Sequence, residues 1–364
     1  MKRARRRRPA WIASFSAAGL AVLAVVSVQA PAQASPTLLR DLFTRVTGIQ
    51  SGPPSLPVSY RWPKGFIPNV IQPDVPPPGA ITVDAAGHLA RCAHPGRLPV
   101  ILVHGTWENQ HDNWVAGAPL LFNAGFCVYS FNYGGPPGAP FAATRSIPAS
   151  AAELGIFIDK VRAVTGSNQV DILGHSQGGS MPRYYVKFLP QAWTGRSFGQ
   201  GVPKIRHLIA LSPSNHGTTL DGLVKLGQLT GTIGAVNTFV LPQAAIDQEI
   251  GSGVTLKMNT CPGGRPNADV CAGDKVNYTN IETVGDEVIT PFRHAFLAAN
   301  PAAKSRVVNI LLQDTCPIDA SEHLTTPYDS FAYGFVLKGL GIANPAAVPG
   351  ASPGCKILLP LVGA

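Results

Sequence analysis

The chain has 364 residues, 45% of them hydrophobic and 13% charged, which is enough apolar material for a large core, and glycine and proline together make up only about a fifth of it. Its formal net charge of +9 falls to +3 without the first 34 residues, and no later run of four or more basic residues points to a nucleic-acid partner. The spacings of zinc sites, EF-hand loops and phosphate-binding loops do not occur in the sequence, so we expect no metal site.

Residues 1–34 have the pattern of a secretory signal peptide. Six basic residues precede an apolar stretch from Trp11 to Val28, and Ala32-Gln33-Ala34 fits a cleavage site. The apolar stretch is long enough for a membrane anchor, but its small residues and the cleavage site favour a signal peptide. We therefore expect secretion after cleavage near Ala34, with no stable membrane span left. The arginine run is compatible with both general and twin-arginine export.

The rest of the chain divides into a proline-rich segment, residues 35–90, and a predicted catalytic domain, residues 91–364. Nine prolines lie between Pro53 and Pro78, and they favour an extended, peripheral segment over a core strand or helix. The length of the mature chain fits one large domain with insertions, or two domains.

From residue 98 onward, apolar runs alternate with helical patterns. We expect strands at residues 98–103, 127–133, 170–173, 204–211, 278–284 and 306–312, and helices at 118–124 and 150–164. The longer helix is predicted to begin at Ser150 as N-cap, with Glu153 completing a capping box. This order predicts an α/β fold with a mostly parallel, doubly wound sheet and helices on both faces.

Residues 220–258 form a long, mainly apolar insertion between two predicted strands. The segment is either an ordinary packed pair of helices or a cap or lid that lines an acyl pocket. We favour the cap, because so long an insertion usually has a function.

The mature chain contains six cysteines, an even number that indicates three disulfides in an exported protein. Fifteen pairings are open in principle. The pairs that we expect are Cys92–Cys127, Cys261–Cys271 and Cys316–Cys355.

The most informative stretch is residues 170–179, Val-Asp-Ile-Leu-Gly-His-Ser-Gln-Gly-Gly. An apolar strand runs into Gly174-His-Ser176-Gln-Gly178, and a helical pattern follows. This is the G-x-S-x-G motif in the strand–turn–helix setting that presents a serine nucleophile above a sheet. We therefore predict Ser176 as the nucleophile of an acyl-transfer reaction.

A serine nucleophile needs a base, and the base needs an acid that fixes its tautomer. In proteins with this turn, the acid and then the base follow the serine along the chain. Only His323 follows the last predicted strand, whereas His294 lies eight residues past the candidate acid with no strand between them. We predict His323 as the base.

The acid is expected at the exit of the preceding strand, residues 278–284. Asp286 lies directly past this strand, where the catalytic groups of parallel sheets collect. Glu287 is a close rival, and we predict Asp286.

The oxyanion of an acyl-transfer reaction needs preorganised N–H donors. One is expected to be the backbone of Gln177, directly after the nucleophile. The other is expected to be the backbone of Thr106, with or without its hydroxyl, after the first buried strand. We place His175 and Trp107 in the substrate pocket and interpret His104 as a structural histidine.

Several of these motifs resemble secreted α/β-hydrolase lipases of the class 2 type, and also the fungal lipase B enzymes. The G-x-S-x-G turn at Ser176 is shared by the whole hydrolase superfamily. The sequence Gly-Asp286-Glu-Val-Ile and a cysteine seven residues before His323 are more specific to these lipases. Val-His-Gly-Thr106 and Ser-Pro-Ser-Asn-His-Gly-Thr218 add to the likeness, which covers about residues 90–355.

The resemblance implies an α/β-hydrolase fold and an ester-hydrolysing lipase without a cofactor. It also implies Ser176, Asp286 and His323 as a catalytic triad, with Thr106 and Gln177 as oxyanion donors. The lipase B likeness supports the pairs Cys92–Cys127 and Cys316–Cys355. The proline-rich residues 35–80 and the Cys261–Cys271 loop have no counterpart in it.

These observations favour a secreted lipase acting on triacylglycerols or similar acyl esters, including esters at an oil–water interface. The alternatives on the same triad are a short-chain esterase, a polyester hydrolase or an acyltransferase. A non-catalytic binding module of hydrolase fold is disfavoured, because every part of the triad is present. No motif encodes the chain-length preference, the stereochemical preference or the oligomeric state.

Overall fold

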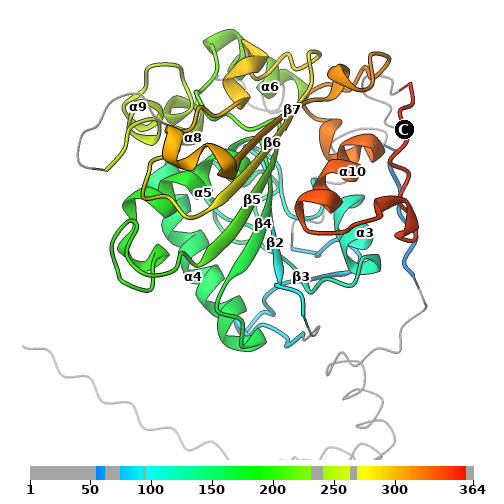
Figure 1. Cartoon of the computed structure of the whole chain (residues 1–364), viewed down its shortest axis with the longest axis horizontal. Helices are drawn as coiled ribbons and strands as arrows, with labels where there is room; N and C mark the ends of the chain where they lie inside the picture. Colours follow the sequence, from blue (N-terminus) through cyan, green and yellow to red (C-terminus); the bar gives the residue numbers. More distant parts are fainter. Residues whose placement is uncertain (1–54, 62–73, 93–95, 231–240, 263–268, 358–364) are drawn as a thin grey trace, which may run out of the picture. The chain divides into compact units, whose positions relative to one another are not determined.

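Seven parallel strands form the centre of the computed structural model, and helices cover both faces of the sheet (Figure 1). The structure describes residues 55–61, 74–92, 96–230, 241–262 and 269–357. The strands are β1 Ala80–Ile81, β2 Val100–Val103, β3 Val128–Ser130, β4 Val170–His175, β5 Ile205–Leu211, β6 Asn277–Glu282 and β7 Val307–Leu311. The α-helices among these residues are α3 Gly117–Asn123, α4 Ile147–Thr165, α5 Gln177–Phe188, α6 Leu220–Leu229, α8 Gln243–Asp247, α9 Gly253–Met258 and α10 Ser330–Gly339.

The strand order is β1-β3-β2-β4-β5-β6-β7, and every neighbouring pair is parallel. The doubly wound parallel sheet predicted from the sequence is therefore confirmed. Because the chain runs outward from β2 in one direction to β3 and then in the other direction from β4, the loops after β2 and β4 flank the point where the winding reverses. Ligand sites of such sheets lie at this point, beyond the carboxyl ends of the strands.

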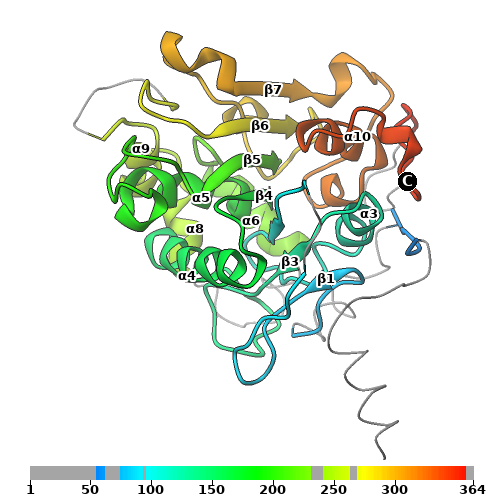
Figure 2. The same ribbon diagram turned by 60° about the horizontal axis from the view of Figure 1, so that its bottom comes forward.

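The side chains of the central strands alternate between two separate cores. Ile101 and Val103 belong to the core under α4 and α5, whereas Val100 and Leu102 belong to the core under α3 and α10. Figure 2 shows the same two helical layers, with α4 and α5 on one side of the strands and α3 and α10 on the other. Burial on both faces explains why these strands are apolar throughout rather than alternating.

The start of α4 differs from the prediction. The N-cap is Ser146, whose Oγ accepts a hydrogen bond from the Ala149 N–H, and Ser150 is buried inside the helix. Glu153 does not complete a capping box; it accepts the Gly134 N–H at 2.8 Å and pairs with Arg145. The first turn of a helix tolerates proline, because its N–H groups have no partner within the helix. Pro148, the second residue of α4, is therefore compatible with a helix that begins at Ile147.

A second difference is β1, a two-residue strand at the end of the proline-rich segment, where we expected no strand. Ala80 and Ile81 pair with Val128 and Tyr129 at the edge of the sheet. A strand of only two residues is too short to show an alternating pattern of apolar and polar residues in the sequence. The predicted signal peptide lies outside the described residues, as does most of residues 35–80.

Three disulfides join Cys92 to Cys127, Cys261 to Cys271 and Cys316 to Cys355, the same pairs as expected. The first and third close loops of 35 and 39 residues, and chain entropy gives each about 4 kcal/mol of stabilisation. All described residues belong to the unit Thr44–Ala364. Within them, no helix has both the length and the apolar character that crossing a bilayer requires.

Candidate active site

The turn between β4 and α5 holds Ser176 in a strained backbone conformation. Its φ of 53° lies in the left-handed region, which non-glycine residues rarely adopt. Glycine is required on both sides, because a Cβ at Gly174 would stand 2.1 Å from the Gly178 oxygen, and one at Gly178 would stand 2.1 Å from the Val103 oxygen. The sequence therefore packs this turn tightly against the end of β2 and fixes the position of Ser176.

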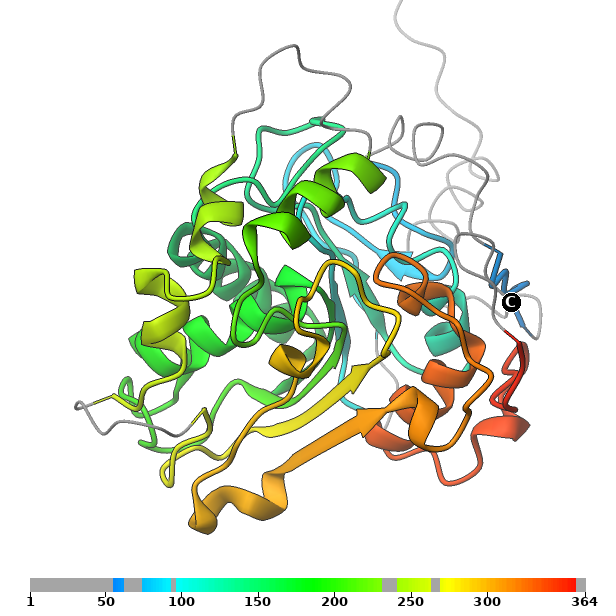
Figure 3. The same cartoon turned by 90° about the horizontal axis from the view of Figure 1, so that it is seen from above.

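Ser176, His323 and Asp286 form a hydrogen-bonded chain. His323 Nε2 lies 3.0 Å from Ser176 Oγ, and His323 Nδ1 lies 2.8 Å from Asp286 Oδ2. The three residues follow β4, β7 and β6, so the parallel sheet brings their loops to one edge. Figure 3 shows β6 in yellow and β7 in orange side by side, with their arrows pointing the same way. The structure thus brings together the three residues that the sequence analysis selected as nucleophile, base and acid.

The second oxygen of Asp286 fixes the carboxyl group in place. Oδ1 accepts the backbone N–H groups of Val288 at 2.8 Å and Ile289 at 2.7 Å. Burial alone would raise the pKa of Asp286, but the charge and hydrogen bond of His323 outweigh it and hold that pKa below the usual value. Because an ionised Asp286 only accepts hydrogen bonds, it requires the proton on His323 Nδ1, and Nε2 is then left to accept the Ser176 hydroxyl.

The environment of His323 favours its charged form. Burial would lower the pKa of this imidazole, but the Asp286 charge and hydrogen bond raise it, with a further contribution from Glu108. The net result is a pKa above the ordinary histidine value of 6.5. An imidazole with a raised pKa accepts a proton readily.

Thr106 and Gln177, the expected oxyanion donors, lie side by side and are almost completely buried. The Thr106 hydroxyl donates to Gln177 Oε1 at 2.5 Å and accepts from Gln248 Nε2 at 2.8 Å. The hydroxyl is therefore already engaged in this state, which leaves the two backbone N–H groups as the expected donors. Gln177 is the first residue of α5, and an N–H at that position has no partner within the helix.

Gln248 is a residue that the sequence analysis missed. It follows α8 in the 220–258 insertion, and it accepts from Ser214 Oγ at 2.7 Å while donating to Thr106. A lone glutamine in a turn carries no sequence signal for such a role. Through Gln248, the insertion contacts Thr106 directly.

His175, which we placed in the substrate pocket, lies next to Ser176 in the chain and is buried like it. Its side chain is fully buried, with Nδ1 2.8 Å from Glu108 Oε2 and Nε2 3.0 Å from the backbone oxygen of His323. Its partner Glu108 is an acidic residue to which the sequence analysis gave no role. Burial would raise the pKa of Glu108, but His175 outweighs that effect and lowers it.

The same Glu108 carboxylate also holds the loop that carries the expected oxyanion donor. Its Oε2 accepts the Gly105 N–H at 2.9 Å, and Oε1 accepts from Asn113 at 3.1 Å. Glu108 and His175 therefore connect the segment after β2 to the backbone of His323.

Trp107 belongs to an apolar cluster beside the hydrogen-bonded chain. Its φ is 62°, and its side chain is 6% exposed. The buried members of this Trp107 cluster come from the loops after β2, β6 and β7 and from α6: Trp107, Leu226, Val288, Ile289, Ala295 and Leu324. Because Leu226 belongs to the insertion, α6 lies against the loops that carry Asp286 and His323.

Three further histidines, His104, His216 and His294, have structural contacts, as expected for His104. It stacks on Tyr133 with ring centroids 4.6 Å apart, and burial lowers its pKa to about 4. His216 pairs with Asp269 at 3.0 Å, and His294 contacts the Gly217 oxygen. Since a neutral, buried His104 engages its own loop through the Gly105 oxygen, it is not a second base.

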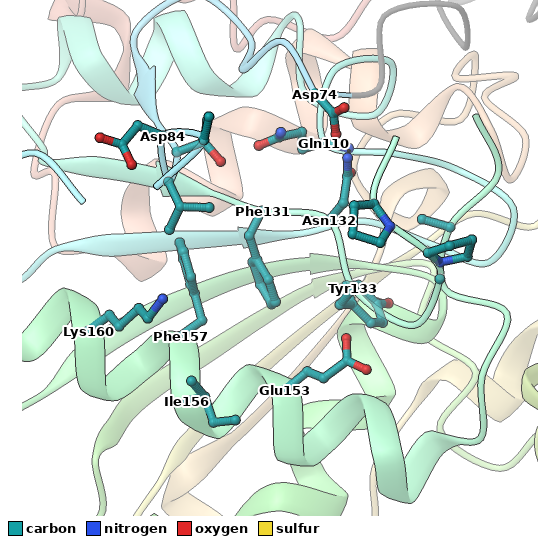
Figure 4. A pocket seen from close by; sticks show the side chains of 17 residues that line it. Asp74, Asp84, Gln110, Phe131, Asn132, Tyr133, Glu153, Ile156, Phe157 and Lys160 are labelled. Atoms are coloured by element: carbon teal, nitrogen blue, oxygen red, sulfur yellow. Dashed lines mark hydrogen bonds between the residues drawn. The ribbon is translucent and has the colours of Figure 1, made fainter. Parts of the chain in front are cut away.

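A cavity of about 720 Å³ lies away from Ser176, between α4, the end of β3 and the segment after β1. Figure 4 shows Phe131, Phe157 and Tyr133 in its wall, with Glu153 and Lys160 at the α4 side. None of Ser176, Asp286 and His323 lines it. The described residues contain no group of three or more metal-ligating side chains placed to hold a metal ion.

Comparison with known proteins places these features in context. Residues 97–237 match the family model described as Lipase (class 2). Triacylglycerol lipases of Pseudarthrobacter phenanthrenivorans and Burkholderia plantarii are each 34% identical to this chain over 100 residues, or 26% of it. Those matches span only 30% and 26% of the relatives' own lengths.

The fold is similar to that of lipase B from Aspergillus fumigatus. The TM-score is 0.52 at 21% sequence identity, and the match covers 78% of this chain and 62% of that one. Together with the parallel sheet and its order, this similarity identifies an α/β-hydrolase fold.

Proposed function

We propose that this chain, an α/β-hydrolase whose residues 97–237 match the class 2 lipases, is a secreted serine hydrolase that cleaves carboxylic esters through an acyl-enzyme. The observation that carries the proposal is the hydrogen-bonded chain from Ser176 Oγ through His323 to Asp286. Nucleophile, base and orienting acid within hydrogen-bond reach are the signature of this chemistry.

In the first half-reaction, His323 Nε2 takes the proton of Ser176 as Oγ bonds to the ester carbonyl carbon. The backbone N–H groups of Thr106 and Gln177 stabilise the developing oxyanion; one such donor contributes about 3–4 kcal/mol to transition-state binding. The C–O bond to the alcohol then breaks, and the alcohol leaves with the proton from His323. Water, activated by His323, hydrolyses the acyl-enzyme in the second half-reaction and releases the acid.

The proposed domain organisation follows the same assignment. Residues 1–34 are a signal peptide, 35–90 are a proline-rich segment, and 91–364 are the catalytic domain. Three disulfides support an oxidising, extracellular compartment.

The predicted cap, residues 220–258, is proposed to line the acyl site; its residues 231–240 lie outside the described residues. This assignment is supported by two contacts of the insertion: Gln248 with Thr106, and Leu226 with the Trp107 cluster. The apolar character of the Trp107 cluster and of the described part of the insertion suits an acyl chain, so long-chain esters such as triacylglycerols are the proposed substrates.

The chain-length preference can be measured on the purified protein. Each methylene that an acyl chain buries contributes about 0.8 kcal/mol, or about a fourfold gain in binding. We expect kcat/KM to rise through a series of p-nitrophenyl esters of increasing acyl length, and emulsified triacylglycerol to be hydrolysed. The Ser176→Ala variant supplies the blank. A maximum at the acetyl ester, with no turnover of emulsions, would instead identify a short-chain esterase.

The pH dependence follows from the raised pKa of His323. The base must be neutral to take the serine proton, so kcat/KM should fall as pH drops through that pKa. We expect the midpoint of the acid limb to lie above 6.5, the ordinary histidine value. The measurement is kcat/KM on a soluble ester from about pH 5 to about pH 9. If kcat/KM did not fall anywhere between about pH 9 and about pH 5, His323 would not act as the base.

A further inference from the structure

Glu282, the last residue of β6, is a fully buried acid beside the proposed triad. Its Oε1 accepts the Thr283 N–H at 2.8 Å and the Ser212 hydroxyl at 3.2 Å. Its Oε2 accepts no hydrogen bond from an N–H group or a hydroxyl of the described residues. The carboxyl group of Asp286 lies within hydrogen-bonding reach of the Glu282 carboxyl group. Two buried carboxyl groups therefore lie close together at the proposed catalytic acid.

Two carboxylates in contact in a buried site cannot both be ionised without a large cost, so one of them holds a proton. Asp286 is the one that is stabilised as an anion, because it accepts His323 and the backbone N–H groups of Val288 and Ile289. Among the residues that the structure describes, Glu282 forms no ion pair, and its Oε2 has no hydrogen-bond partner. A proton on Oε2 converts this unsatisfied acceptor into a hydrogen-bond donor for the nearby Asp286 carboxylate.

We propose that Glu282 remains protonated at neutral pH and donates its Oε2–H to the Asp286 carboxylate, as a positioning residue of the triad. This inference rests on the proposed function, since its consequence is expressed through His323. The bond fixes the Asp286 carboxyl group and withdraws part of its negative charge. It thereby limits how far Asp286 raises the proton affinity of His323.

The direction of the pKa of Glu282 agrees with this geometry. Burial, followed by the neighbouring Asp286 charge, raises it well above its ordinary value. Other titratable groups also face the pair. Glu108 after β2 and Glu322 next to His323 both act to raise the pKa of His323, and the ring of His175 lies 4.9 Å from that of His323. An ionised Glu282 would add a further negative charge to this group and would bias His323 more strongly toward its charged form.

The test compares Glu282→Gln with Glu282→Leu. The glutamine amide is uncharged and can still donate to Asp286 while its oxygen accepts from Ser212 and Thr283. We expect E282Q to keep kcat/KM within about threefold and its acid limb within about 0.3 pH unit of the wild type. Glu282→Leu removes the donor, and we expect its acid limb to move up by about one pH unit, which leaves roughly a tenth of the neutral base at low pH.

A second readout does not depend on turnover. The infrared difference spectrum of wild type minus E282Q at neutral pH should contain the carbonyl stretch of one protonated carboxyl group. Fluorophosphonate titration and thermal unfolding establish that each variant is folded. If E282L does not fold, the E282Q profile and the infrared difference carry the test.

The outcomes are distinct. A downward shift of the acid limb in E282Q, with no protonated-carboxyl band in the difference spectrum, would mean that Glu282 is ionised and would overturn the proposal. Equal pH profiles for all three proteins would also overturn it, because Glu282 would then not act on His323. Failure of the proposed function would appear separately, as ester turnover that survives Ser176→Ala, and the infrared band would still report the protonation of Glu282.

Discussion

Replacing Ser176 with alanine is expected to abolish ester turnover while the protein stays folded. Loss of the nucleophile in a triad enzyme lowers kcat by about a millionfold, because the base and acid then have nothing to activate. Alanine retains the Cβ that the left-handed turn already accommodates, and the lost hydroxyl has one described partner, His323 Nε2. The free energy of unfolding should change by no more than about 1 kcal/mol.

The matched control is Ser180→Ala, one turn further along α5. Ser180 is also buried, and its hydroxyl contacts Gln177 O and Ser214 Oγ rather than His323. The measurements are p-nitrophenyl ester turnover, fluorophosphonate labelling and thermal unfolding. We expect S176A to lose turnover and labelling and S180A to retain both. Full activity in S176A would remove the basis for an acyl-enzyme at this position.

The sequence was sufficient for those parts of the site that obey local or topological rules. The turn at Ser176 could be predicted because its two glycines and its strand–helix setting are consecutive in the chain. Asp286 and His323 could be predicted because parallel strands end at one edge, so the residues after β6 and β7 meet there. These inferences need only the order of the strands, which the apolar runs supply.

Buried polar partners could not be predicted in the same way. Glu108 contacts His175 across 67 positions of the chain, and Gln248 contacts Thr106 across 142. Which polar side chains face one another in the interior depends on how the loops pack, and no spacing encodes it. For this reason the sequence analysis did not identify Glu108 as the partner of His175.

The ends of elements were also only approximate, because competing local signals are similar in strength. Ser146 and Ser150 are both suitable N-caps, and Glu153 made the later one look like a capping box. In the structure Glu153 is engaged by the Gly134 N–H. Tertiary contacts thus select between two local solutions that the sequence alone leaves close together.

Asp286→Asn is also expected to lower kcat by orders of magnitude, although less than loss of the nucleophile and for a different reason. The asparagine side chain has the same shape, but only one of its two terminal atoms accepts hydrogen bonds. In the native protein, Oδ1 accepts from the Val288 and Ile289 backbones, and Oδ2 accepts from His323 Nδ1. If the amide oxygen faced His323 instead, the amide nitrogen would meet two buried N–H donors, at a cost of about 1–3 kcal/mol for each unsatisfied group.

The amide oxygen of the substituted side chain is therefore expected to take the place of Oδ1, which points the NH₂ group at His323 Nδ1. The ring then adopts the tautomer with its proton on Nε2, and it cannot accept the proton of Ser176. A change of tautomer with the geometry intact lowers kcat by about 10⁴-fold in a Ser-His-Asp enzyme. KM should change by only a few-fold, since Asp286 lies behind His323 and does not face the ester.

Glu287→Gln is the matched control, because it neutralises the acid next in sequence, the rival that the sequence alone could not exclude. Among the described residues, Asp286 lies 2.8 Å from His323 Nδ1, and Glu287 forms no hydrogen bond or ion pair with His323. We therefore expect E287Q to retain kcat within about threefold of the wild type. The kcat of D286N should fall by about four orders of magnitude. The measurements are kcat and KM on a soluble ester, with thermal unfolding to verify the fold. If the two variants exchanged these results, Glu287 would be the orienting acid. If D286N stayed within tenfold of the wild type, His323 would hold its reactive tautomer without a carboxylate, and the contacts of its backbone with His175 would have to supply the orientation instead.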